Sequence, residues 1–187
     1  MKHPSLKDYI VVLDDILPHS VCDKILAEYA QTDEWVQTEI GSGINTNIRS
    51  AKTIQMSEDF VLAKNFELRK KLDADVFAGA SKAIQAYNEK FEHCRIEEDS
   101  GYELLRYETG QFYTIHTDSF KARPRAVSCS FALNDDYEGG EFSFFDKETN
   151  IKAPKGGAVL FPSNFMYPHE ILPVTIGTRY SIITWFI

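Results

Sequence analysis

The pattern of hydrophobic and polar positions predicts a helical front and a β-rich back. From Ser57 to Phe91, apolar residues recur at helical spacing and form one continuous face in the second half of the segment. That face consists of Val76, Ala80, Ile84, Tyr87 and Phe91. Because an amphipathic helix has to bury its apolar face, we predict that this helix packs on the back of a sheet.

A shorter helix is predicted nearer the N-terminus. It follows a β-rich run at residues 9–13 and begins at Ser20, where Ser20 and Asp23 resemble a variant capping box. Residues 41–50 are rich in Gly, Ser and Asn, which is typical of a loop. This loop has two interpretations: an ordinary surface connection, or a segment that moves over a substrate at the mouth of an active site.

After residue 101, strand formers alternate with turn residues. We predict strands at residues 102–107, 126–133, 141–145, 158–161, 170–174 and 180–187, separated by turns such as Gly139-Gly140. Many short strands with tight turns are typical of a jelly roll or related barrel, so the expected fold is mainly β (α+β) with N-terminal supporting helices. At 187 residues without an internal repeat, we expect one domain over 1–187, with a helical front at 1–99 and a β-rich part at 100–187.

Composition and charge narrow the classes of partner. The net charge of −8, with 28 acidic and 20 basic residues, argues against a nucleic-acid partner. The three cysteines are widely spaced and form no Cys-x-x-Cys motif, which favours a reducing compartment. No stretch approaches the roughly 20 apolar residues of a membrane span. We therefore expect a cytoplasmic protein with no membrane partner.

The candidate chemistry lies at His116, Asp118 and His169. In extended backbone, His116 and Asp118 point to the same side, roughly 6.5 to 7 Å apart, so both can contact one ion. His169 is the best candidate for a third ligand. Two imidazoles and a carboxylate that leave open positions form the facial triad of non-haem Fe(II) oxygenases. The alternative is that all three are ordinary hydrogen-bonded or exposed side chains.

Arg179 is a second candidate because it begins the last apolar segment. By alternation it shares a strand face with Ser181, Ile183 and Trp185. A guanidinium in hydrophobic surroundings is costly without an anionic partner. A carboxylate held in bidentate geometry is the best such partner, with the Ser181 hydroxyl beside it. The alternative is an ion pair with an acidic side chain of the protein.

Four ordered motifs carry a family resemblance. They are Tyr107-x-x-Gly110-x-x-Tyr113-x-x-His116-x-Asp118, Gly139-Gly140-Glu-Phe, Pro168-His169-Glu-Ile-x-Pro173 and Gly177-x-Arg179-Tyr-Ser-Ile-Ile-Thr-Trp185. Together they closely resemble the prolyl 4-hydroxylase-like Fe(II)/2-oxoglutarate-dependent oxygenases. The resemblance implies a double-stranded β-helix core in which His116, Asp118 and His169 hold Fe(II). It further implies 2-oxoglutarate and O2 as cosubstrates, ascorbate as a candidate reductant, and Arg179, helped by Tyr107, as the residue that binds the distal carboxylate of 2-oxoglutarate.

One departure from the family concerns Ala132, where prolyl hydroxylase relatives usually carry a tyrosine. Tyr107 and Ser181 are the two candidates for the missing hydroxyl. The remaining candidate pocket residues are Tyr113, Ser128, Trp185 and Arg49. Arg49 belongs to the loop at 41–50 and would act as a substrate clamp, while core packing is the alternative role for Tyr113 and Trp185.

The resemblance implies hydroxylation of a C–H bond with release of succinate and CO2. A prolyl residue in a peptide or protein is the favoured substrate, and a small molecule or free amino acid is the alternative. Alkylation-repair relatives typically carry a second arginine six residues after the first, where this chain has Trp185. A non-catalytic barrel that only binds is the remaining alternative.

Overall fold

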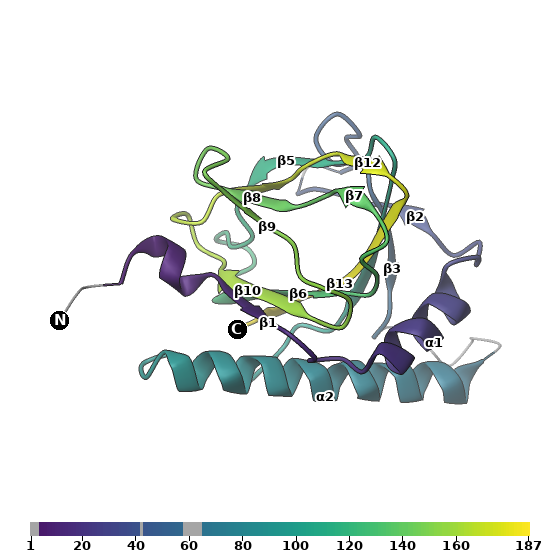
Figure 1. Cartoon of the computed structure of the whole chain (residues 1–187), viewed down its shortest axis with the longest axis horizontal. Helices are drawn as coiled ribbons and strands as arrows, with labels where there is room; N and C mark the ends of the chain where they lie inside the picture. Colours follow the sequence, from purple (N-terminus) through teal and green to yellow (C-terminus); the bar gives the residue numbers. More distant parts are fainter. Residues whose placement is uncertain (1–3, 42, 58–64) are drawn as a thin grey trace.

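The computed structural model describes residues 4–41, 43–57 and 65–187 and is built mainly from β-strands (Figure 1). The front contains the 3-10 helix η1 (Leu6–Tyr9), β1 (Val11–Leu13), α1 (His19–Tyr29), β2 (Val36–Gln37), β3 (Lys52–Gln55) and α2 (Phe66–Lys90). The strands that follow are β4 (Glu103–Glu108), β5 (Tyr113–His116), β6 (Val127–Ala132), β7 (Glu138–Gly139), β8 (Phe142–Phe144), β9 (Thr149–Ile151), β10 (Ala158–Pro162), β11 (His169–Ile171), β12 (Val174–Ile176) and β13 (Thr178–Phe186).

Two sheets enclose the interior of the barrel. The larger sheet has the strand order β1-β10-β6-β13-β4-β3-β2, and the smaller one has the order β5-β11-β8-β9. A two-stranded pair of β12 and β7 closes one side between them (Figure 1). Neighbouring strands pair antiparallel throughout, and strands distant in sequence, such as β4 and β13, lie side by side. The arrangement is the double-stranded β-helix, so the predicted fold is confirmed.

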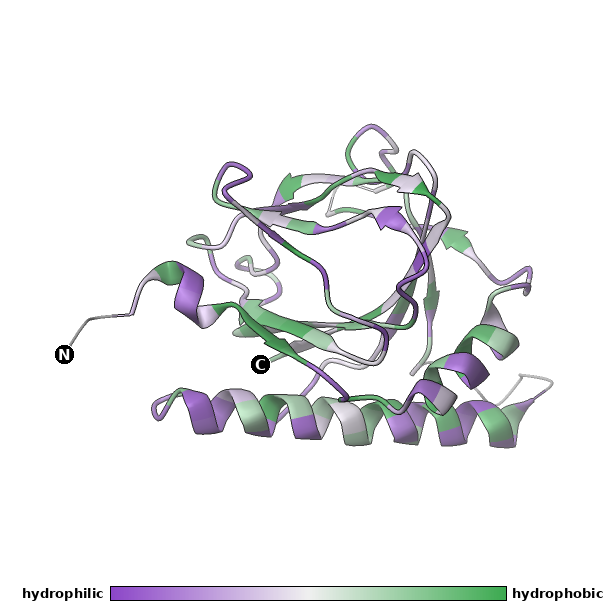
Figure 2. Cartoon of the chain, in the orientation of Figure 1, coloured by the Kyte–Doolittle hydropathy of each residue, from purple (hydrophilic) through white to green (hydrophobic). Residues whose placement is uncertain are grey.

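The larger sheet separates two hydrophobic cores. On β13, Ile182 and Phe186 face the helices, while Ile183 and Trp185 face the barrel interior. This is the period of two expected for a strand buried on both sides. The helix-facing core also receives the apolar face of α2, which runs along the outside of the sheet (Figure 1). The predicted packing of this helix is therefore confirmed, and Figure 2 shows the alternation of hydrophobic and hydrophilic positions along it.

Both helices begin at other residues than predicted. α1 begins at His19, with Pro18 as its N-cap and no side-chain cap bond, so the capping box at Ser20 and Asp23 is wrong. Ser20 already lies inside the first turn, and only the residue before the helix has the non-helical backbone that side-chain capping requires. α2 begins at Phe66, later than the predicted Ser57; residues 58–64 of that prediction lie outside the described residues.

The strand predicted at residues 170–174 is in fact two strands. β11 ends at Ile171 and pairs with β5 and β8, whereas β12 begins at Val174 and pairs with β7. Pro173 lies between them and has no N–H to donate to a ladder, which explains the break. Neither α-helix in the described ranges has the length and hydropathy that crossing a membrane requires.

Candidate metal centre and cosubstrate pocket

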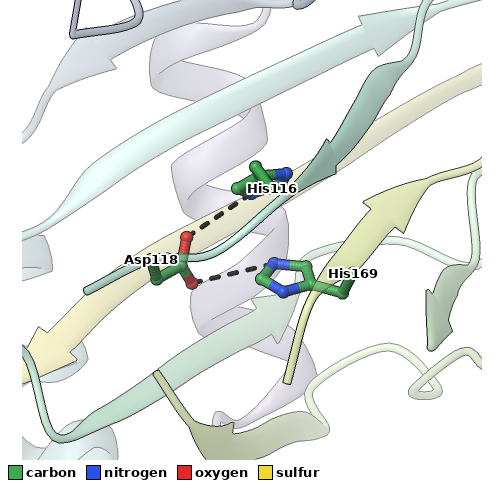
Figure 3. A group of neighbouring side chains, drawn as sticks. All are labelled: His116, Asp118 and His169. Atoms are coloured by element: carbon green, nitrogen blue, oxygen red, sulfur yellow. Dashed lines mark ion pairs between the residues drawn. The ribbon is translucent and has the colours of Figure 1, made fainter. Parts of the chain in front are cut away.

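Strand pairing brings His116, Asp118 and His169 together. His116 ends β5 and His169 begins β11, and the two residues lie opposite each other in the antiparallel ladder. Asp118 follows β5 by two residues and turns toward both imidazoles (Figure 3). One possible ligand atom from each residue lies within 4.8 Å of the others. The three side chains therefore have the composition and proximity that an octahedral metal with open positions requires.

Both imidazoles direct the same nitrogen at the carboxylate. Nδ1 of His116 lies 2.9 Å from the carbonyl of Thr114, and Nδ1 of His169 lies 3.1 Å from the carbonyl of Tyr167. The Nε2 atoms lie 3.4 and 3.7 Å from the two oxygens of Asp118. A carbonyl that accepts from Nδ1–H leaves the lone pair on Nε2. In both histidines Nε2 is thus the available ligand atom.

The Asp118 carboxylate is fixed by a serine behind it. Ser128 Oγ donates to Asp118 Oδ2 at 2.6 Å and also hydrogen-bonds Ser163 Oγ at 2.8 Å. Burial by itself would raise the pKa of Asp118, but His169, His116 and the hydrogen bond from Ser128 outweigh it and lower the pKa below its usual range. Asp118 is therefore an anion at neutral pH, as a metal ligand has to be.

His169 is held neutral. Burial lowers its pKa to about 4, although the nearby Asp118 carboxylate acts in the opposite direction. At pH 7 its Nε2 lone pair is therefore free of a proton. A neutral imidazole and an ionised carboxylate are ready to bind a cation without first releasing protons.

Arg179 lies in the wall of the same cavity as this triad. The cavity has a volume of about 800 Å³, and its lining includes all three triad residues. The Arg179 side chain is 5% exposed, its guanidinium carbon lies 5.2 Å from the ring centre of Tyr107, and no carboxylate among the described residues lies within 4 Å of it. A buried guanidinium without an anionic partner fits a carboxylate ligand better than the alternative internal ion pair.

Most of the other predicted pocket residues lie at this cavity. Tyr107, Tyr113, Trp185 and Arg49 are in its lining. The Tyr113 ring stacks on His116 with ring centroids 3.5 Å apart. The guanidinium carbon of Arg49 lies 4.8 Å from the centre of the same Tyr113 ring. The Arg49 side chain is also within hydrogen-bonding reach of Tyr107. Gly41, Gly43, Ile44 and Arg49 thus contribute to the cavity wall, and movement of this loop over a substrate stays a prediction.

Two predicted residues are placed differently. Ser128 is fully buried behind Asp118, outside the cavity lining, because its hydroxyl is taken up by the carboxylate and Ser163. Ser181 also lies outside the lining, and its Oγ has no hydrogen-bond partner in the part of the chain that the structure describes. Ser181 lies opposite Ala132 in the ladder between β13 and β6, so its role at the cosubstrate pocket stays a prediction.

Sequence reasoning assigned no site role to Arg125 or Tyr137. Arg125 lies 3.3 Å from the ring centre of Trp185 and donates to the carbonyl of Asp118 at 3.1 Å. It thereby connects the triad to the cavity wall. Tyr137 lies beside Arg179 at the inner end of the barrel. The signal for Arg125 was its place at the start of β6; the one for Tyr137 was an aromatic residue shortly before Gly139-Gly140.

Comparison with known proteins identifies the class. Residues 102–187 match the family model of the 2OG-Fe(II) oxygenase superfamily. A PKHD-type hydroxylase of Polaromonas sp. (strain JS666 / ATCC BAA-500) is 44% identical over 63 residues, which cover 32% of this chain and 27% of the relative. One of Psychrobacter sp. (strain PRwf-1) is 36% identical over 91 residues, covering 42% and 34%. The matched segments span about a third of these relatives' length.

Solved structures agree on the fold. A prolyl hydroxylase from Trichoplax adhaerens, in complex with a hypoxia inducible factor oxygen degradation domain peptide fragment, superposes with a TM-score of 0.77 at 19% identity, covering 96% of this chain and 83% of that one. A Pseudomonas putida prolyl-4-hydroxylase gives 0.74 at 22% identity, covering 95% and 92%. Residues 102–187 thus match the 2OG-Fe(II) oxygenase superfamily, and the two prolyl hydroxylase structures share the fold of the chain; both findings support the resemblance to the prolyl 4-hydroxylase-like oxygenases.

Proposed function

We propose that the chain is an Fe(II)- and 2-oxoglutarate-dependent dioxygenase that hydroxylates a C–H bond. The single observation that carries this proposal is the convergence, in one cavity, of the triad and a buried arginine that has no carboxylate partner among the described residues. The superfamily of the matched domain implies Fe(II), 2-oxoglutarate and O2. When bound, Fe(II) with these two cosubstrates supplies the oxidation that inserts one oxygen atom into the substrate, with release of succinate and CO2.

The protein's own residues would hold the metal ion and orient the cosubstrate. His116, Asp118 and His169 would hold Fe(II) through two Nε2 atoms and one carboxylate, leaving the remaining positions for cosubstrates. Arg179 would bind the distal carboxylate of 2-oxoglutarate and so fix its orientation. Trp185 and Arg125 stack on each other in the cavity wall and would shield the reaction from water. This shielding would keep the reaction directed at the substrate.

A prolyl residue in a peptide or protein is the proposed substrate. The relatives are named PKHD-type hydroxylases, and one solved structure of this fold is a prolyl hydroxylase with a peptide fragment bound. The cavity lining includes residues 36–41, 43 and 44, and the exposed side chains of Val36, Ile44 and Phe120 belong to it. An open apolar rim of this kind suits an extended chain better than a ligand that is enclosed on all sides.

A second candidate is the hydroxylation of a small acid or free amino acid. Arg49, Arg123 and Arg125 all line the cavity, so a free carboxylate on a substrate would find cations there in addition to Arg179. A peptide, whose carboxylate lies far from the reacting carbon, would not need them. The two candidates therefore differ in the substrate's charge near the triad.

The experiment is a substrate screen with Fe(II) and 2-oxoglutarate. Peptides with one proline are compared with the same peptides carrying alanine at that position and with free amino acids. The proposal predicts the mass gain of one oxygen atom on the proline peptides alone, with matching succinate formation, and loss of both in Asp118→Ala. A mass gain on free amino acids alone would favour the second candidate. No mass gain and no succinate from iron-loaded, folded protein would contradict both.

A further inference from the structure

The inner end of the barrel lacks the phenol that the family resemblance leads one to expect. Ala132 ends β6 opposite Ser181 of β13, and its methyl group leaves a hollow of about 10 Å³ beside Arg179. A space of this size holds about one water molecule. Tyr107 approaches Arg179 with its ring while its hydroxyl is within reach of Arg49, so its hydroxyl is directed elsewhere. The distal end of the pocket therefore needs another hydrogen-bond donor.

Tyr137 reaches this hollow from a different element. It precedes β7, is 6% exposed, and lines the hollow together with Ala132 and Arg179. A Cβ added at Gly140 would lie 3.0 Å from Cδ of Arg179 and 3.3 Å from Cε2 of Tyr137. Both side chains thus pack on the bare backbone of Gly140, and the guanidinium lies within hydrogen-bonding reach of the phenol.

Lys152 fixes the ring from its other side. Its Nζ donates to the carbonyl of Tyr137 at 2.6 Å and lies 3.6 Å from the centre of the ring. No carboxylate in the described ranges lies within 4 Å of this ammonium group. The hollow is therefore bordered by two cations and a phenol with no internal anion, which is the environment expected around the carboxylate of a ligand.

The hydroxyl of Tyr137 can donate a hydrogen bond. A guanidinium carries only donors, so when these two side chains hydrogen-bond, Arg179 is the donor and the phenolic oxygen of Tyr137 is the acceptor. The hydroxyl proton is then free for another acceptor, and none among the described residues receives it in a hydrogen bond. Burial raises the pKa of Tyr137 above its ordinary value although Arg179 lowers it, so the hydroxyl remains protonated at neutral pH.

We propose that Tyr137 is a positioning residue for the distal carboxylate of 2-oxoglutarate and takes the place of the tyrosine that relatives carry at the position of Ala132. Its hydroxyl and the guanidinium of Arg179 would bind the same carboxylate from neighbouring directions. The inference rests on the proposed use of 2-oxoglutarate. It assigns a role to a residue that reaches the pocket from the turn before β7 rather than from β6.

The test is an equilibrium titration of Fe(II)-loaded protein without oxygen, followed by the visible charge-transfer band of the bound keto acid. 2-Oxoglutarate is compared with 2-oxovalerate, which has the same chain length but a methyl group in place of the distal carboxylate. In Tyr137→Phe, the Kd for 2-oxoglutarate should rise about tenfold to a hundredfold, the range for one hydrogen bond to a charged group. The Kd for 2-oxovalerate should not change.

Tyr180→Phe is the matched control, because Tyr180 lies on the helix-facing side of β13 and should leave both affinities unchanged. An unchanged 2-oxoglutarate Kd in Tyr137→Phe would overturn the inference. So would equal weakening of both ligands together with a lower unfolding temperature, since that pattern indicates a structural role. If wild-type protein binds neither keto acid, the proposed function itself fails, which the titration separates from failure of the Tyr137 assignment.

Discussion

Removing the hydroxyl of Ser128 should weaken the metal centre without touching a ligand. In Ser128→Ala, Asp118 Oδ2 loses a hydrogen bond of 2.6 Å in a buried environment. A hydrogen bond to a charged group contributes about 1.5–3 kcal/mol. Loss of a group that orients a metal ligand typically lowers metal affinity about 10–100-fold. Since about 1.4 kcal/mol corresponds to a factor of ten, the two magnitudes agree.

The assay is a competition titration of Fe(II) against a chelating dye under anaerobic conditions. We expect the Kd of Ser128→Ala to rise about 10–100-fold. Ser163→Ala should have a smaller effect, because its hydroxyl contacts Ser128 and not the carboxylate. Ser143→Ala is the matched control: it is equally buried, and its hydroxyl has no hydrogen-bond partner among the described residues. Unchanged affinity in folded Ser128→Ala would refute the orienting role.

Three further predictions concern pH, the inner pocket and the helices. In chelator-treated protein, the pKa of His169 is about 4 in the folded state, whereas in the unfolded state it returns to its ordinary value of 6.5. Because the unfolded state then binds the proton first, the free energy of unfolding should fall as the pH drops from 6.5 to 4. Urea titrations should show this slope, and His169→Gln should flatten it. Gly140→Ala places a Cβ 3.0 Å from Arg179 at a φ of +69°, so 2-oxoglutarate affinity should fall at least about tenfold while Fe(II) affinity is retained, as calorimetry can check. Arg69→Gln breaks the 2.7 Å ion pairs of α2 with Glu28 of α1 and with Glu34, which follows α1, and should cost about 3 kcal/mol in urea unfolding. No loss would contradict the partly buried pairing.

Two of the three triad residues were predictable from local geometry. His116 and Asp118 are two residues apart at a strand end, and alternation alone indicates that they share a side. Arg179 was found for a related reason, since a charge on an apolar strand is visible in the sequence. The meeting of His169 with His116 required a fold, and the family resemblance supplied it.

The errors at the pocket arise where tertiary contacts decide which side chains line it. Ser128 was predicted to line the pocket, but its position along β6 puts it behind Asp118 rather than in the cavity. Nothing in the spacing of residues tells these two positions apart. Tyr137 escaped notice because its approach to Arg179 depends on the missing side chain of Gly140, a contact between a turn and a distant strand.

Local backbone chemistry explains the misplaced boundaries. The start of α1 is set by Pro18, whose fixed φ suits the position before a helix and whose carbonyl accepts from the N–H groups of Val21 and Cys22. The serine pattern two residues later has no capping bond. The break between β11 and β12 follows from Pro173, which was visible in the sequence but lay within an otherwise β-rich run. At both places a proline, and not the helix or strand propensity of the neighbouring residues, sets the boundary.

The most direct test of the central claim is the anaerobic addition of 2-oxoglutarate to Fe(II)-loaded protein. The account predicts a visible metal-to-ligand charge-transfer band in the wild-type protein and its loss in His169→Ala. Folded, metal-loaded protein that shows no band at saturating 2-oxoglutarate would contradict the assignment of the triad and favour a barrel that only binds.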